Sequence, residues 1–186
     1  MNREQALELL HKNMQNENLR KHCYAVEAVM RALARHFGED PDIWGIAGLL
    51  HDSDYELTKD NPPKHTRIAQ KWLEEKNVDK RIIDAILAHG YGYEEGNPEP
   101  VTKMEWSLYT CDELTGLIVA TALVKGRSLD NVTAESVLKK FPEKSFAAGV
   151  DREQIKLCEA QLNIPINEFV ATALDAMKGI HTELGL

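Results

Sequence analysis

The dipeptide His51-Asp52 stands directly after an apolar run, Trp44–Leu50, in this chain of 186 residues. A hydrophobic segment of this kind delivers an imidazole and a carboxylate to its buried end. Burying both groups without a partner costs several kcal/mol, so something must satisfy them. A hydrogen bond between the two side chains, with a backbone cap, is one interpretation. A bound metal ion is another.

Four more polar residues occur where apolar faces are expected to turn inward or where helices are expected to end. His22 lies on the same helical stripe as Val26 and Val29. Asp112 lies in the middle of a long apolar segment, where an unpaired carboxylate is out of place. His65 begins a predicted helix and His89 ends another. The residues that together favour a metal site are His22, His51, Asp52, His65, His89 and Asp112.

The order His22…His51-Asp52…Asp112, with GLLHDSDYE around the pair, resembles the HD superfamily of metal-dependent phosphohydrolases over roughly residues 18–125. The resemblance implies that these four residues bind one metal ion in the middle of a helical bundle. In members with two metals, two further histidines lie between the pair and the final Asp. Here His65 and His89 match those positions, and Asp52 would then bridge the ions.

The chain also departs from that pattern. It reads His-Asp-Ser-Asp rather than His-Asp-Ile-Gly, and Tyr55 stands where some nucleotidases of the superfamily have a Glu, with Glu56 one residue later. A specific nucleotidase mechanism therefore does not transfer to this chain.

Four imidazoles and two carboxylates suit Fe, Mn, Co, Ni or Zn better than Mg, which prefers an all-oxygen shell. One or two such ions would attract a phosphate and activate a water molecule near neutral pH. With Asp52 as a ligand, the next acids along the chain, Asp54 and Glu56, are candidates for positioning a ligand or acting as the general base.

Phosphate recognition also requires cations near the metals. The expected substrate-binding residues are Lys64 and Arg67, which flank His65, and Lys21 beside His22. Lys125 is 13 residues beyond Asp112, about 20 Å along a helix, so we expect it not to reach the same phosphate.

Helical periodicity dominates the chain, and no alternating β pattern of useful length occurs. We expect an all-α, single-domain helical bundle of about eight helices over residues 1–186. Residues 18–125 would form an HD-like metal-binding core, and the helices of 126–186 would complete the bundle. The helices expected after the first include one capped by Asn18 and others over residues 65–76, 79–89, 103–125, 133–141, 151–162 and 166–183.

Composition excludes several classes of protein. The formal net charge of −8, from 22 Lys and Arg against 30 Asp and Glu, disfavours duplex nucleic acid as a partner. The longest purely apolar stretch, Leu117–Val124, is far shorter than the roughly 18 residues of a membrane helix. The first residues contain no apolar signal core. Three widely spaced cysteines predict buried packing residues in a cytoplasmic protein rather than a disulfide framework: Cys23, Cys111 and Cys158.

The leading hypothesis is a phosphohydrolase that cleaves a small phosphomonoester or phosphodiester, with a nucleotide as the expected substrate. A di-iron oxygenase on the same ligand set is one alternative. Another alternative is a non-catalytic module, in which the metal stabilises the helical bundle and a pocket binds a ligand. Substrate identity, the number and kind of metal ions, and the oligomeric state lie beyond what these residues determine.

Overall fold

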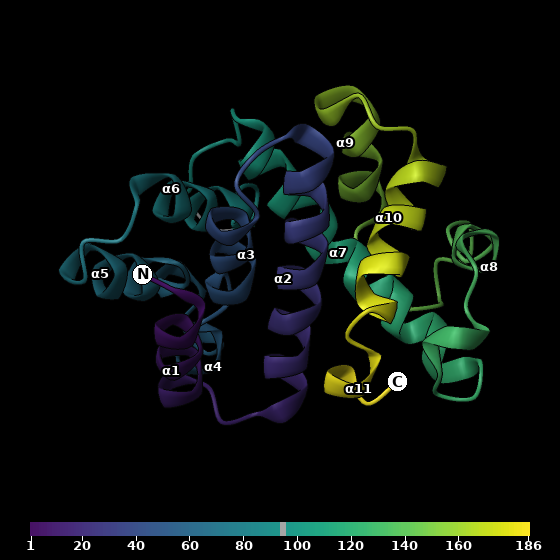
Figure 1. The fold of residues 1–186 in the computed structure, drawn as a ribbon, viewed down its shortest axis with the longest axis horizontal. Helices are drawn as coiled ribbons and strands as arrows, with labels where there is room; N and C mark the ends of the chain where they lie inside the picture. Colours follow the sequence, from purple (N-terminus) through teal and green to yellow (C-terminus); the bar gives the residue numbers. More distant parts are fainter. Residues whose placement is uncertain (94–95) are drawn as a thin grey trace.

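The computed structural model describes residues 1–93 and 96–186. Within these ranges the chain is helical throughout, with eleven α-helices, two 3-10 helices and no strand (Figure 1). This confirms the expected all-α class. The helices are α1 (Arg3–Asn13), α2 (Glu17–Phe37), α3 (Pro41–Leu50), α4 (Tyr55–Thr58), η1 (Pro62–Lys64), α5 (Arg67–Glu75), α6 (Lys80–His89), α7 (Lys103–Val124), η2 (Leu129–Asn131), α8 (Ala134–Leu138), α9 (Arg152–Leu162), α10 (Ile166–Lys178) and α11 (His181–Leu184).

The structure has more helices than expected because one predicted helix is split and the short α4 was not predicted, and other predicted helices are shorter than expected. The segment predicted as one helix over 166–183 breaks near Gly179 into α10 and α11. The segment predicted over 133–141 keeps helical structure only in the short α8. The helix predicted from His65 begins only at Arg67.

Side-chain caps explain most helix starts. Asn2 and Gln5 form a capping box at α1, and Asp40 caps α3 ahead of Pro41. The prediction that Asn18 caps the second helix was wrong. The cap is Asn16, whose side chain accepts from the backbone N–H of Asn18 at 2.9 Å.

Helices α2 and α3 pack with their backbones almost in contact. A Cβ added at Gly48 in α3 would lie 2.9 Å from the Val26 carbonyl oxygen of α2. The chain reverses between the two helices, after Gly38 ends α2 with φ 71°. This reversal brings the end of α3, with His51, back beside the start of α2, with His22.

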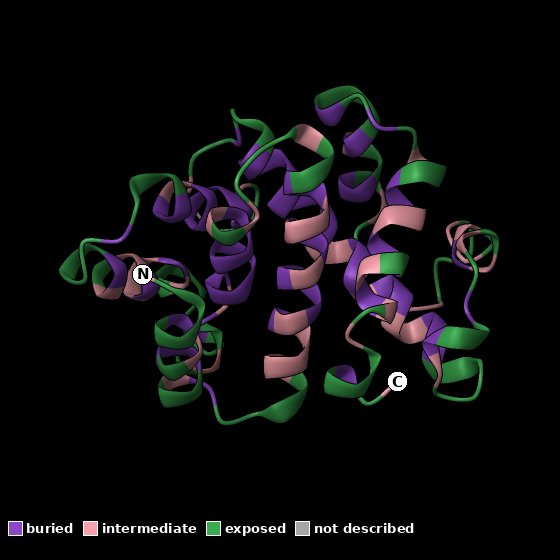
Figure 2. Cartoon of the chain, in the orientation of Figure 1, coloured by how far each residue is buried: buried purple, intermediate pink, exposed green. Residues whose placement is uncertain are grey.

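Helix α7 runs through the middle of the molecule beside α2, α6 and α9 (Figure 1). It is long and apolar enough to cross a membrane, yet most of its apolar part is buried inside the fold. Figure 2 shows buried residues where α7 passes through the middle of the molecule. This is the behaviour of the core helix of a helical domain.

The C-terminal part, residues 126–186, packs against the same central helices. Helix α9 lies on α7, and α10 lies on α2. One cluster of buried apolar side chains extends from Ala6 in α1 to Leu184 in α11. Trp44 and Trp106 belong to this core, as expected, and Trp72 packs at its edge.

Candidate metal centre

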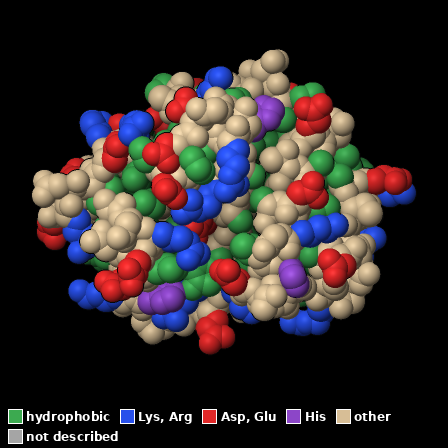
Figure 3. Space-filling model, in the orientation of Figure 1, with side chains coloured by type: hydrophobic (Ala, Val, Ile, Leu, Met, Phe, Trp, Pro, Cys, Tyr) green, Lys and Arg blue, Asp and Glu red, His purple; other side chains and the backbone are tan. Residues whose placement is uncertain are grey.

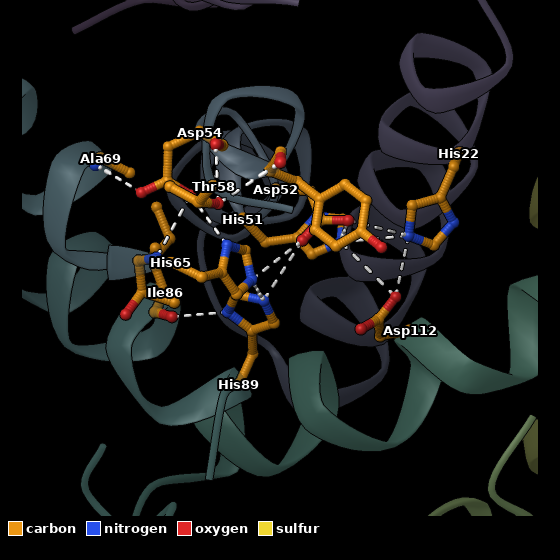
Figure 4. Close-up of polar contacts among 12 residues, drawn as sticks. His22, His51, Asp52, Asp54, Thr58, His65, Ala69, Ile86, His89 and Asp112 are labelled. Atoms are coloured by element: carbon orange, nitrogen blue, oxygen red, sulfur yellow. Dashed lines mark hydrogen bonds and ion pairs between the residues drawn. The ribbon is translucent and has the colours of Figure 1, made fainter. Parts of the chain in front are cut away.

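Five separate segments bring six polar side chains to one place inside the bundle (Figure 4). The side chains come from α2, from the end of α3, from the turn before α5, from the last residue of α6 and from the middle of α7. They are His22, His51, Asp52, His65, His89 and Asp112, the set singled out in the sequence.

Three of these side chains form a first group. The Nε2 atom of His22 lies 2.9 Å from Oδ1 of Asp112 and 3.2 Å from Nε2 of His51. The His51 Nε2 atom lies 3.5 Å from the same Asp112 oxygen. The three ligand atoms all lie within 4.8 Å of one another, close enough for one ion to bind all of them.

A second group lies beside the first, and Asp52 joins the two. The Nε2 atoms of His65 and His89 are 3.2 Å apart and lie 3.3 and 3.4 Å from Oδ1 of Asp52. The other Asp52 oxygen, Oδ2, lies 3.6 Å from Nε2 of His51 and 3.8 Å from that of His22. His51 also groups with Asp52 and His89 within 4.8 Å, so it lies between the two halves.

The outer nitrogen of each imidazole has a partner that orients the ring. The Nδ1 atom of His51 donates to the Gly48 carbonyl at 2.8 Å, and that of His89 donates to the Ile86 carbonyl at 2.5 Å. A carbonyl oxygen only accepts, so the proton sits on Nδ1 in both rings. The lone pair of Nε2 is thereby directed into the cluster, as in metal-binding histidines.

The other two rings are held by side chains. His65 donates from Nδ1 to Oδ1 of Asp54 at 2.8 Å. The Thr115 hydroxyl donates to the Asp112 carbonyl at 2.8 Å, so its oxygen is free to accept from Nδ1 of His22 at 3.3 Å. All four Nε2 atoms therefore face the centre.

This donor set fits one or two metal ions. Ligand atoms about 2.0–2.1 Å from one ion, in tetrahedral or octahedral arrangement, lie about 2.8–3.4 Å apart. The observed separations within the two groups, 2.9–3.5 Å, lie close to that range. Facing Nε2 lone pairs 3.2 Å apart repel each other unless a proton or a cation lies between them.

The pKa shifts of the cluster residues in the metal-free protein also indicate a site that binds positive charge. Burial lowers the pKa of His51, but the Asp52 and Asp112 carboxylates outweigh it and raise that pKa to about 9. Burial also lowers the pKa of His65, but the hydrogen bonds that its ring donates to the Asp52 and Asp54 carboxylates raise that pKa to about 10. Burial alone would raise the pKa of Asp52, yet the His51 charge and neighbouring imidazoles hold it well below its usual value. The site attracts positive charge, and protons supply it when metal is absent.

The cluster is most exposed to solvent at His22 and Asp112, while Asp52 and His65 have side-chain exposures of 15% and 11%. The side-chain exposure is 0% for His51 and 4% for His89, but 20% for Asp112 and 28% for His22. A small molecule therefore approaches from the side of His22 and Asp112.

Of the two acids expected beyond the pair, the structure brings only Asp54 to the cluster. Its fully buried carboxylate accepts from His65 and from the backbone N–H groups of Thr66 at 3.2 Å and Ala69 at 2.9 Å. It therefore positions His65 and the turn in which Thr66 adopts φ 66°.

Glu56 points elsewhere, and its expected role as a general base needs correction. Its Oε2 atom accepts from the backbone N–H groups of Gln15 at 2.6 Å and Asn16 at 3.0 Å. These contacts clamp the loop between α1 and α2, because the carboxylate satisfies N–H groups that precede a helix.

The three expected substrate-binding cations lie in different parts of the structure. Arg67 donates to the Gly96 carbonyl at the far end of the loop after α6, and Lys64 is exposed in η1. Lys21 lies next to His22 on α2 and lines a cavity together with it. Lys125 reaches the Asn131 carbonyl, away from the cluster, as its distance along α7 predicted.

Sequence reasoning missed two contacts of the cluster. Thr115 holds the His22 ring; its place one turn after Asp112 on the same helix face was the available signal. The Tyr55 ring stands edge-on to His65 with 5.7 Å between centroids.

In the loop after His89, Tyr93 donates to Gln154 of α9 at 2.9 Å, and Tyr91 stacks at a tilt with Tyr109.

The cysteines are buried as expected, and the remaining histidines lie outside the cluster. The three cysteines are buried and free. The three histidines outside the cluster are exposed: His11, His36 and His181.

Another cavity lies on a different face of the molecule from the metal cluster. Figure 3 shows Lys and Arg side chains across the centre of that face, over α2. Arg3, Arg31 and Arg35 line a cavity of about 450 Å³ there. Glu27 accepts from Arg3 at 2.7 Å and from Arg31 at 2.9 Å, so much of this charge is compensated. None of the six cluster residues lines this cavity.

The fold and the site together define a class: a helical domain that gathers four imidazoles and two carboxylates from five segments. The family model described as HD domain matches residues 19–120, which is more than half of the chain. The chain belongs to the HD-domain family.

Named relatives match this chain over only part of their own length. Ribonuclease Y of Sulfurovum sp. (strain NBC37-1) is 34% identical over 79 residues, 42% of this chain and 15% of that protein. Ribonuclease Y of Treponema pallidum (strain Nichols) is 23% identical over 175 residues, 90% of this chain and 33% of that protein. The chain thus spans a third or less of the length of these relatives.

Two solved structures share the fold over nearly the whole chain. The HD domain of the L. monocytogenes phosphodiesterase PgpH is 16% identical with a TM-score of 0.59, covering 92% of this chain and 98% of that one. The same domain in complex with cyclic-di-AMP is 17% identical with a TM-score of 0.60, covering 93% and 96%. At this identity the likeness shows the fold.

Proposed function

We propose that this protein is a metal-dependent phosphohydrolase that cleaves a phosphomonoester or phosphodiester of a small molecule, with a nucleotide as substrate. The observation that carries the proposal is Asp52, whose two oxygens face two separate histidine groups. A carboxylate placed in this way suits a pair of divalent ions, and a metal pair is a common arrangement for phosphoester hydrolysis.

The relatives support phosphoester chemistry. Those named above are ribonucleases and a phosphodiesterase, and one neighbouring structure contains a cyclic dinucleotide. A shared family narrows the reaction class, while the substrate depends on the pocket of each member.

The residues have distinct roles in this proposal. His22, His51 and Asp112 would hold one divalent ion and His65 and His89 a second, with Asp52 available to both. When bound, ions of the Fe, Mn, Co, Ni or Zn type supply Lewis acidity and lower the pKa of a coordinated water. Asp54 keeps the His65 ring in place, and Thr115 does the same for His22. Lys21 offers a positive charge at the open side of the site.

The test is hydrolysis by the purified chain with Mn²⁺, Co²⁺ or Ni²⁺, against an aryl phosphate and panels of nucleotide mono- and diesters. Metal content is measured in the same samples. We expect turnover of at least one phosphoester, and its loss in Asp52→Ala. Absence of turnover across both panels at proven metal occupancy would overturn the proposal. Oxygen consumption by the iron-loaded protein would support the oxygenase alternative, and tight ligand binding without turnover would support the binding module.

A further inference from the structure

A second cavity touches the metal cluster directly. It has a volume of about 390 Å³ and shares His22 with the cluster, and small-molecule sites commonly measure about 300–1,000 Å³. It also lies on the side toward which the cluster opens, since His22 and Asp112 are its most exposed members. We call it the His22 pocket; its lining residues used below are Asn18, Lys21, His22, Val119, Leu123, Arg127 and Leu184.

Two helix faces lead from the cluster into this pocket. On α7, Asp112, Val119 and Leu123 lie at spacings of seven and four residues, which is one side of a helix. At 1.5 Å per residue, Leu123 lies about 16 Å beyond Asp112 along the axis. On α2, Asn18 lies one turn before His22. The pocket therefore extends the metal site by roughly the length of a nucleotide.

Arg127 reaches the pocket because the chain turns back after α7. Gly126 has φ 82° and Arg127 has φ 59°, two consecutive left-handed residues. The Arg127 N–H then donates to the Ala122 carbonyl at 2.9 Å. This turn returns Arg127 beside Leu123, whereas Lys125 points away to Asn131.

The pocket is lined by both cationic and apolar residues. Lys21 and Arg127 supply two positive charges, and Asn18 supplies an amide. No Asp or Glu side chain lines the pocket, which the last residue, Leu186, also lines, and neither cation forms an ion pair in the described ranges 1–93 and 96–186. Val119, Leu123 and Leu184 form its apolar wall, and Leu123 is 44% exposed. In a chain of net charge −8, this pocket combines two cations with an apolar wall.

We propose that the His22 pocket binds the organic part of the substrate and selects phosphoesters that carry a second anionic group. The apolar wall packs against the base or another flat group, while Lys21 and Arg127 bind a phosphate that is not cleaved. The substrate class is thus a nucleotide with at least one phosphate besides the scissile one. This inference rests on the proposed function for its catalytic meaning, whereas binding at the pocket is measurable without turnover.

Equilibrium binding tests the pocket by itself. Adenosine 3′,5′-bisphosphate and adenosine are titrated by calorimetry into the full chain treated with chelator, so that hydrolysis does not contribute. We expect the bisphosphate to bind and adenosine to bind at least tenfold more weakly. Lys21→Gln and Arg127→Gln should each weaken bisphosphate binding about tenfold or more, since each removes a hydrogen bond to a charged group.

Lys139→Gln is the matched control, because it removes the same charge from an exposed residue of the segment after α8, paired only with Glu135. It should bind the bisphosphate like the parent chain. Circular dichroism melting of all three variants checks that each is folded. Equal binding of adenosine and the bisphosphate, or unchanged affinity in both pocket variants, would overturn the inference.

Kinetics separate this inference from the proposed function. With metal restored, the ratio of kcat/KM for the bisphosphate to that for an aryl phosphate should fall in Lys21→Gln and Arg127→Gln and stay constant in Lys139→Gln. If the chain hydrolyses no phosphoester but the binding pattern holds, the proposed function fails and the pocket stands. If hydrolysis occurs with an unchanged ratio, the function stands and the pocket assignment fails.

Discussion

The Nδ1 atom of His65 donates to Oδ1 of Asp54 at 2.8 Å, and the Asp54 carboxylate is completely buried. The same carboxylate accepts from two backbone N–H groups at the start of α5. One side chain thus fixes both the ring of His65 and the turn that carries it. Because the two backbone N–H groups fix the Asp54 carboxylate, the His65 ring cannot rotate without breaking its own buried hydrogen bond to it.

Asp54→Asn should weaken the second metal position. An amide offers one accepting oxygen instead of two, so one buried N–H loses its partner at a cost of about 1–3 kcal/mol. Loss of the carboxylate behind a metal-binding histidine typically lowers metal affinity about 10–100-fold. Metal titration and thermal melting measure the two effects. Asp60→Asn, at an exposed residue of the next loop, should change neither, and equal metal affinity in Asp54→Asn would contradict the assigned role.

His65→Ala and His89→Ala should each lower the bound metal toward one ion per chain. Both rings lie in the half of the cluster that also contains Oδ1 of Asp52, whereas His22 and Asp112 lie in the other half. Elemental analysis of the purified variants measures the stoichiometry. His181→Ala, at an exposed histidine, is the control. A parent stoichiometry near one that does not change in either variant would show a single-ion site.

The metal-free protein should lose stability as the pH rises from about 6.5 to 10. The pKa of His51 is raised to about 9 and that of His65 to about 10 in the folded state, against about 6.5 when unfolded. A raised pKa means that the folded state binds the proton more tightly, so its stabilisation is complete below pH 6.5 and disappears as the pH passes 9–10.

Melting temperatures across that range, with chelator and with Mn²⁺, measure this effect. Metal replaces the protons, so the loaded protein should be less sensitive and its metal affinity should increase with pH. A melting temperature of the chelated protein that rises between pH 7 and 10 would contradict this explanation.

Gly48→Ala should destabilise the fold and displace His51. The added Cβ would lie 2.9 Å from the Val26 carbonyl oxygen and 3.0 Å from Glu27 Cα, and both are backbone atoms of α2. Helices α2 and α3 would have to separate, and the Gly48 carbonyl that orients His51 would move with them. Overpacking of this kind costs about 1–3 kcal/mol. Urea unfolding measures it. Gly149→Ala, where a Cβ meets nothing within 4 Å, should leave the stability close to that of the parent.

Glu56→Gln should leave the turnover number unchanged and lower the melting temperature. Its carboxylate accepts from Gln15 and Asn16 in the loop before α2, and an amide is a weaker acceptor for the two N–H groups. Steady-state kinetics and melting on the same sample test both parts. A fall in kcat of two orders of magnitude with an unchanged melting temperature would restore the general-base role.

The amino-acid sequence by itself determined the helical class and most helix boundaries. Capping residues such as Asn2 and Asp40 and the apolar stripe of α2 act within a few residues, so their effect is visible locally. For the same reason the inward positions of the six cluster residues were recognisable, because an imidazole or carboxylate on an apolar face stands out from its neighbours.

Only the tertiary structure decided which of these groups meet. Asp54 and Glu56 follow the His51-Asp52 pair at similar spacing, yet one supports His65 and the other clamps a loop some forty residues earlier in the chain. Arg127 is fifteen residues beyond Asp112, yet it lines the pocket that adjoins the cluster because two left-handed residues turn the chain back toward Ala122. Helix periodicity specifies a face, whereas the partner of that face depends on how helices distant in sequence pack.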